Sequence, residues 1–145
     1  MLTCHDIANY FLATLDSEAG DLMSNLKLQK LVYYAQGFHL ALYDKPLFDS
    51  PIEAWAHGPV VPELYHRFKA YGANAIPETP AIEVSHYGPQ VLELLEEVST
   101  VYGQFSATKL RNMTHEEAPW KQTPLGQVIS HERMQQFFKT RLVQA

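Results

Sequence analysis

Hydrophobic residues recur every three or four positions along most of this chain of 145 residues, a spacing that gathers them on one face of an α-helix. The segment 26–43 shows the pattern best. Its apolar face would carry Leu28, Leu31, Val32, Ala35, Phe38, His39 and Leu42. The opposite face carries Tyr33, Gly37 and Leu40 in place of charged residues. We therefore expect a long helix that is covered on both sides and lies in the middle of the fold.

Residues that favour helix starts precede several of the periodic segments. Thr3, Ser24, Ser106 and Ser130 each stand before one, where a hydroxyl can accept a hydrogen bond from a free amide of the first turn. Apolar stripes that end at a glycine predict two further helices. The expected helices cover about 3–16, a long segment from 24, 62–72, 88–103, and segments that start at 106 and 130.

Two short apolar segments, 52–55 and 127–129, predict strands that pair with each other. A tight turn is expected at 57–59 and a surface loop over 73–85, because both carry proline among residues without helical spacing. Thr114 and Glu117 fit a capping box at a helix start. The sequence thus predicts a mainly α fold: a compact single-domain helical bundle (1–145) around a central buried helix, with a small two-stranded β element.

Composition and charge narrow the class of protein. The chain is 46% hydrophobic, has a net charge of -5 and contains one cysteine. Because its basic residues are scattered, we expect no direct binding to DNA. The lone Cys4 cannot form an internal disulfide, and no signal peptide or apolar run long enough to span a bilayer is present. These features favour a cytoplasmic protein without a membrane partner.

Candidate chemistry is sparse. The seven histidines show no metal-ligand spacing, and Cys4 and His5 would point about 100 degrees apart on a helix, so we predict no metal and no cofactor. Folding could bring Glu53, His57 and His115 together as an acid–base group of a small hydrolase or transferase. The sequence supplies no nucleophile elbow or phosphate-binding loop to complete such a site. We therefore predict that the protein is not an enzyme.

Lys27 and Lys30 lie near a helix start, where the helix dipole disfavours positive charge. Two interpretations stay open: an ion pair with a carboxylate such as Glu53, or contact with a partner. Trp55 and Trp120 are typical of core anchors, although an exposed tryptophan can also form part of a binding surface.

Several blocks of the sequence resemble one known family. They are LKLQKLVYYAQG at 26–37, PLF at 46–48, EAWAHGPVVP at 53–62 followed by Tyr65, and a tail with Thr114-His115-Glu116, Pro119-Trp120, Ile129-Ser130, Glu132 and Phe137-Phe138. Their order is similar to that of the Panacea domain family of SocA-like antitoxins, over nearly the whole chain.

The resemblance implies an antitoxin that neutralises a protein toxin encoded nearby, sometimes on a phage, by binding it directly. A second possibility that it implies is an adaptor that delivers the toxin to a ClpXP-type protease. Some relatives carry a DNA-binding helix-turn-helix segment, for which this chain leaves no room. We expect the partner to contact residues on or near the central motif: Lys27, Lys30, Tyr34, Glu53, Trp55, His57 and Tyr65.

Overall fold

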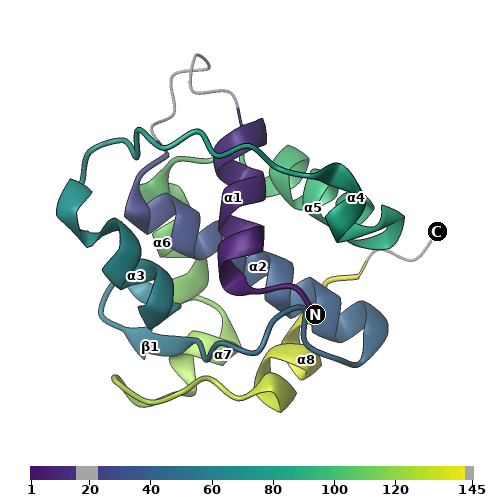
Figure 1. Cartoon of the computed structure of the whole chain (residues 1–145). Helices are drawn as coiled ribbons and strands as arrows, with labels where there is room; N and C mark the ends of the chain where they lie inside the picture. The colour runs from purple at the N-terminus through teal and green to yellow at the C-terminus, as the bar shows by residue number, and fades with distance from the viewer. Residues whose placement is uncertain (16–22, 143–145) are drawn as a thin grey trace.

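The computed structural model describes residues 1–15 and 23–142 and is mainly helical (Figure 1). The elements are α1 (Cys4–Thr14), α2 (Asn25–Tyr43), β1 (Glu53–Trp55), β2 (Gly58–Val60), α3 (Pro62–Phe68), the 3-10 helix η2 (Lys69–Tyr71), α4 (Val84–Tyr87), α5 (Pro89–Tyr102), α6 (Ala107–His115), α7 (Ala118–Lys121) and α8 (His131–Lys139). The predicted fold class is confirmed. Among the described residues, no helix is long and apolar enough to cross a membrane.

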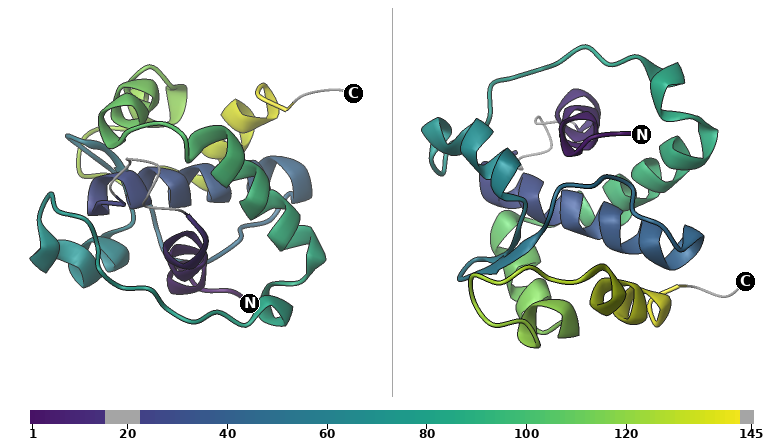
Figure 2. Two further views of the ribbon diagram at one scale, coloured as in Figure 1. Left: turned by 90° about the horizontal axis from the view of Figure 1, so that it is seen from above. Right: turned by 60° about the horizontal axis from the view of Figure 1, so that its bottom comes forward.

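Helix α2 lies at the centre, as the sequence predicts. Every residue of this helix is buried except Leu26, Phe38, Leu42 and Tyr43. It contacts α1 and α3, α5 and α6, α8 and strand β2. Both views in Figure 2 show α1 on one side of α2 and α8 on the other. The helix is therefore enclosed by segments from most of the chain, which explains why it lacks a polar face.

The four predicted hydroxyl caps are all present. Thr3 forms a full capping box with Asp6, and the hydroxyls of Ser24, Ser106 and Ser130 each accept a backbone N–H of the first turn. The expected capping box of Thr114 and Glu117 is wrong. Thr114 lies near the end of α6 and donates to the Arg111 carbonyl, and Glu117 makes no side-chain cap at α7.

The β element differs from the prediction in its pairing. Strand β1 pairs antiparallel with β2, so that Glu53 lies opposite Val60. The sequence instead predicts a turn at the residues where β2 begins. The expected strand 127–129 is reduced to a bridge between Glu53 and Val128. Gly58 has a φ of 110°, which a glycine adopts without strain, so the turn signal and the strand start coincide. Within the expected loop 73–85 the short helix α4 begins.

Aromatic side chains fill the space between α2 and its neighbours. Phe138 of α8 packs edge-on against Tyr33, Tyr34 and Phe38, with ring centroids 5.4, 5.9 and 4.8 Å away. Tyr34 also stacks on Tyr102 of α5 at 4.1 Å. Such ring pairs add to the apolar area that they bury, and they join α2, α5 and α8 in one core.

Candidate partner-binding surface

Three of the seven expected partner-binding residues lie in the interior. Lys27, Lys30 and Tyr34 are 2%, 0% and 0% exposed. Lys27 Nζ donates to the Gly103 carbonyl at 2.7 Å, and Lys30 Nζ donates to the Pro59 carbonyl at 3.0 Å. The expectation that these three side chains meet a partner is corrected by their burial, and Lys30 bonds a backbone carbonyl in place of the suggested Glu53 carboxylate.

The other four residues are partly or fully exposed: Glu53, Trp55 and His57 in the β element and Tyr65 on α3 beside it. The Glu53 carboxylate accepts a hydrogen bond from Trp55 Nε1 at 2.9 Å, and the Trp55 ring meets the Tyr65 ring at 4.9 Å and 67°. His57 is exposed between the two strands. Val128, which the sequence does not single out, pairs with Glu53 and is 54% exposed. We call Glu53, Trp55, Tyr65 and Val128 the β face.

Glu53 and Val128 share this face because of how their backbones pair. The Ala54 amide donates to the Gln127 carbonyl at 3.0 Å, and the Ile129 amide donates to the Ile52 carbonyl at 2.8 Å. These bonds flank the bridge, which is the arrangement of a non-hydrogen-bonded antiparallel pair with closely spaced side chains. Position 54, whose side chain points to the opposite side, is fully buried.

Buried and partly buried side chains hold the backbone of the β element and of the residue that follows it. Trp120 Nε1 donates to the Trp55 carbonyl at 2.7 Å, and Gln29 Oε1 accepts the Val61 amide at 2.8 Å. Lys30 acts in the same way on Pro59. Buried backbone groups need such partners, so these residues support the surface from within and do not form part of it.

The alternative acid–base group is not assembled. In the part of the chain that the structure describes, no hydrogen bond or ion pair joins Glu53 to His57 or His115. The His115 ring stacks on Trp120 at 4.0 Å and 8°. Burial and the nearby Arg111 lower the pKa of His115. The ring therefore packs beneath the β element, and Glu53 is engaged by Trp55.

A family model described as "Antitoxin SocA-like, Panacea domain" matches residues 28–121. The chain belongs to this family. It is 33% identical over 109 residues to a protein named Antitoxin SocA from Caulobacter vibrioides (strain NA1000 / CB15N), and the alignment covers 68% of this chain and 58% of that relative. No solved structure matches it significantly.

The matched region includes most of the predicted central motif, from residue 28 on, and β1. This confirms the family resemblance that the sequence shows. The chain spans less than two thirds of the length of the matched relative. The comparison identifies the domain family. The residues that contact a partner have to be inferred from the surface of this chain.

Among the described residues, one group of potential metal ligands lies between α1 and α3. The ligand atoms of Cys4, His5 and Glu63 lie within 4.8 Å of one another, although the sequence suggests a poor chelate. His5 Nε2 is 2.7 Å from a Glu63 oxygen, and Arg67 Nη1 is 3.2 Å from His5 Nδ1. Burial raises the pKa of the Cys4 thiol to about 11. The protonated thiol and the adjacent guanidinium both oppose a cation here, so we interpret the group as a link between α1 and α3.

A buried carboxylate is the main feature of the Panacea domain that the sequence interpretation misses. Glu117 accepts hydrogen bonds from the Tyr33 and Tyr34 hydroxyls at 3.2 and 2.9 Å. Burial raises the pKa of Glu117 to about 7 and, through loss of solvation, lowers the pKa of Lys30 to about 7. A glutamate at the third position after a threonine is also the signature of a cap, so the local pattern could not reveal these long-range partners.

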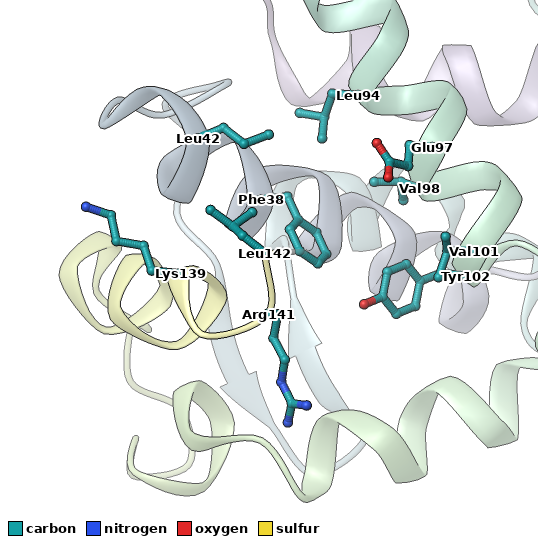
Figure 3. Close-up of a pocket in the computed structure, with 10 residues that line it drawn as sticks. All are labelled: Phe38, Leu42, Leu94, Glu97, Val98, Val101, Tyr102, Lys139, Arg141 and Leu142. Carbon is teal, nitrogen blue, oxygen red and sulfur yellow. The ribbon is translucent and has the colours of Figure 1, made fainter. Parts of the chain in front are cut away.

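A groove of about 510 Å³ opens between α2, α5 and the segment after α8 (Figure 3). Phe38, Val101 and Leu142 contribute apolar lining, and Glu97 and Arg141 contribute charge. No histidine or cysteine lines it. The groove of the Panacea domain is thus mainly apolar, with charged side chains among its lining residues.

Proposed function

We propose that this protein is an antitoxin that neutralises a protein toxin encoded nearby by binding it directly, with the β face at the centre of the contact. The family supports the antitoxin role. The observation that carries the choice of surface is the pair of partly exposed rings, Trp55 and Tyr65, held 4.9 Å apart on an anchored backbone. Tryptophan and tyrosine are enriched among residues that contribute most to protein binding.

The rigidity of the β face favours binding. Association costs free energy when side chains and loops must be ordered. Trp55 is already fixed by Glu53 and Tyr65, and its backbone is fixed by Trp120. The exposed Val128, with Leu125 64% exposed in the same loop, extends the apolar area. A specific interface needs about 800 Å² from each partner, which requires the β face together with its surroundings.

Co-expression with the protein encoded by the adjacent gene tests this proposal. The wild-type chain should restore growth and form a stoichiometric complex. Tyr65→Ala and Val128→Asp should weaken the complex at least tenfold, because each removes or charges an apolar contact at the centre of the β face. Val84→Ala is the matched control, because Val84 is 55% exposed on α4. Circular dichroism shows whether each variant folds. Full rescue by folded Tyr65→Ala and Val128→Asp would contradict the choice of surface.

The same strains separate direct neutralisation from delivery to a protease. If the protein blocks the toxin by covering it, growth is restored equally in cells that lack ClpXP. If it acts as an adaptor, the toxin stays active and accumulates in those cells.

A further inference from the structure

Four basic side chains gather where the turn between β1 and β2 meets the end of α6, beside the first turns of α2. Arg111 and His115 are four residues apart on α6, which places them on one helix face. The Lys30 side chain reaches the same place from α2, on the buried side of the turn. A Cβ atom added to Gly58 would lie 2.7 Å from Lys30 Cε and 2.8 Å from Thr114 Oγ1, so the turn, α2 and α6 are in close contact here.

We call Lys30, His57, Arg111 and His115 the basic cluster. Their mutual proximity appears in their electrostatics: the charge of Arg111 lowers the pKa of Lys30, and the charges of Arg111, Lys30 and His57 lower the pKa of His115. Burial is the largest cause in both cases. Lys30 and His115 thus have positively charged neighbours and have lost solvation at the same time.

The basic cluster lacks compensating negative charge. Across residues 1–15 and 23–142, Arg111 has no ion-pair or hydrogen-bond partner for its guanidinium, and His115 Nε2 is buried without a partner. The fully buried Lys30 is held by one carbonyl, that of Pro59. A buried polar atom without a partner is unfavourable. Arg111, one helical turn away on α6, has no carboxylate beside it among the described residues, so an acidic group placed here would meet complementary partners.

We propose that the solvent-facing part of the basic cluster, Arg111 with His57, is a binding site for a carboxylate side chain presented by the partner toxin, with the buried Lys30 lying beneath it. This inference rests on the proposed function and adds the chemistry of one contact. His57 is exposed and Arg111 and His115 are partly exposed, so the group enters from solvent. A guanidinium is well suited to hold a carboxylate through two parallel hydrogen bonds. The cluster is continuous with the β face, because Trp55 precedes His57 by two residues and Trp120 joins the Trp55 carbonyl to the His115 ring.

Binding of the adjacent-gene toxin to Arg111→Gln is the first test. Loss of a charged hydrogen bond should weaken binding about tenfold or more. Lys109→Gln is the matched control, because Lys109 is exposed on the same helix and its exchange changes the net charge equally. Lys109→Gln should change affinity less than about twofold. Equal affinities of the two variants would overturn the inference.

A scan of the toxin identifies the carboxylate. Each aspartate and glutamate of the toxin is changed to asparagine or glutamine and measured against wild type and Arg111→Gln. One change should weaken binding to wild type about tenfold and leave binding to Arg111→Gln unchanged, because the interaction is already lost. If no toxin carboxylate couples to Arg111, the inference is wrong, and a site for phosphate or another anion would be the better description. If the wild-type chain fails to bind the toxin at all, the proposed function itself fails.

Discussion

At the scale of single residues, the unusual feature is that Glu117 and Lys30 are buried with no ion-pair partner among the described residues. Glu117 meets two tyrosine hydroxyls, and Lys30 meets a backbone carbonyl. Neutral hydrogen bonds compensate only part of the lost solvation of a charge. Both groups therefore titrate nearer neutrality than usual, and their protonation is linked to folding.

Glu117 should make the protein less stable as the pH rises from about 4.5 to about 7. Its pKa is raised from the ordinary 4.5 to about 7 in the folded state. The folded chain therefore keeps a proton that the unfolded chain releases, and the resulting stability, roughly 3 kcal/mol, is present below pH 4.5 and lost by pH 7. Glu117→Gln should remove this dependence. Urea unfolding at pH 5 and pH 8 measures it.

Glu116→Gln is the control for this experiment, because the neighbouring Glu116 is exposed. It should follow the wild-type pH dependence. Parallel pH profiles for wild type and Glu117→Gln would show that burial does not shift Glu117 as described.

Residue types at helix starts could be predicted from the sequence because a cap is a local interaction. Ser24, Ser106 and Ser130 bond an amide three residues ahead, so the pattern contains both partners. Glu117 follows the same pattern at Thr114 but bonds Tyr33 and Tyr34, which lie more than 80 residues away. At such a position the side chain can either cap a helix locally or bond to residues distant in the sequence. Glu117 forms the long-range hydrogen bonds.

At the scale of elements, the contact of α2 with α8 depends on one missing side chain. A methyl group at Gly37 would overlap the ring of Phe138. Glycine costs a helix about 1 kcal/mol relative to alanine, so its presence here indicates that close approach of α8 matters more than helix propensity.

Gly37→Ala should destabilise the protein by about 1–3 kcal/mol, because overpacking outweighs the gain in helix propensity. The double variant Gly37→Ala/Phe138→Leu should be more stable than the sum of the two single changes predicts, since the smaller side chain relieves the overlap. Thermal or urea unfolding of all four proteins measures this coupling. Strict additivity would mean that the two positions do not meet.

The β element shows where prediction of elements ends. The sequence places β1 correctly because its apolar residues are bounded by proline and glycine. It predicts the wrong main partner, since Gly58 and Pro59 are typical of a turn, yet they also begin β2. That β2 follows β1 after only two residues is seen only in the structure, where Lys30 bonds the Pro59 carbonyl of β2.

At the scale of the whole molecule, α2 is covered by α1, α3, α5, α6, α8 and β2. A chain that ends at Ser130, before α8, should lose the native packing of Tyr33 and Tyr34 against Phe138. We expect loss of cooperative unfolding and of near-ultraviolet circular dichroism, with rapid proteolysis. A full-length Phe137→Ala protein, which keeps Phe138 and α8, should unfold cooperatively. Native-like melting of the shortened chain would show that the core is complete without α8.

The candidate surface could be predicted only in part for the same reason. The central motif contains residues that form the β face, such as Trp55 and Tyr65, and residues such as Lys30 that support it from below. Both kinds lie close together in the sequence. Exposure separates them, and exposure depends on which distant segments cover α2.

The position of α8 also has a consequence for synthesis. During translation, α2 leaves the ribosome long before Phe138. The aromatic side chains of α2 are therefore enclosed only after the final helix has been synthesised. A stalled or prematurely terminated message would then yield only protease-sensitive fragments. The amount of folded protein would therefore depend on how often translation is completed, more than on how often it is initiated.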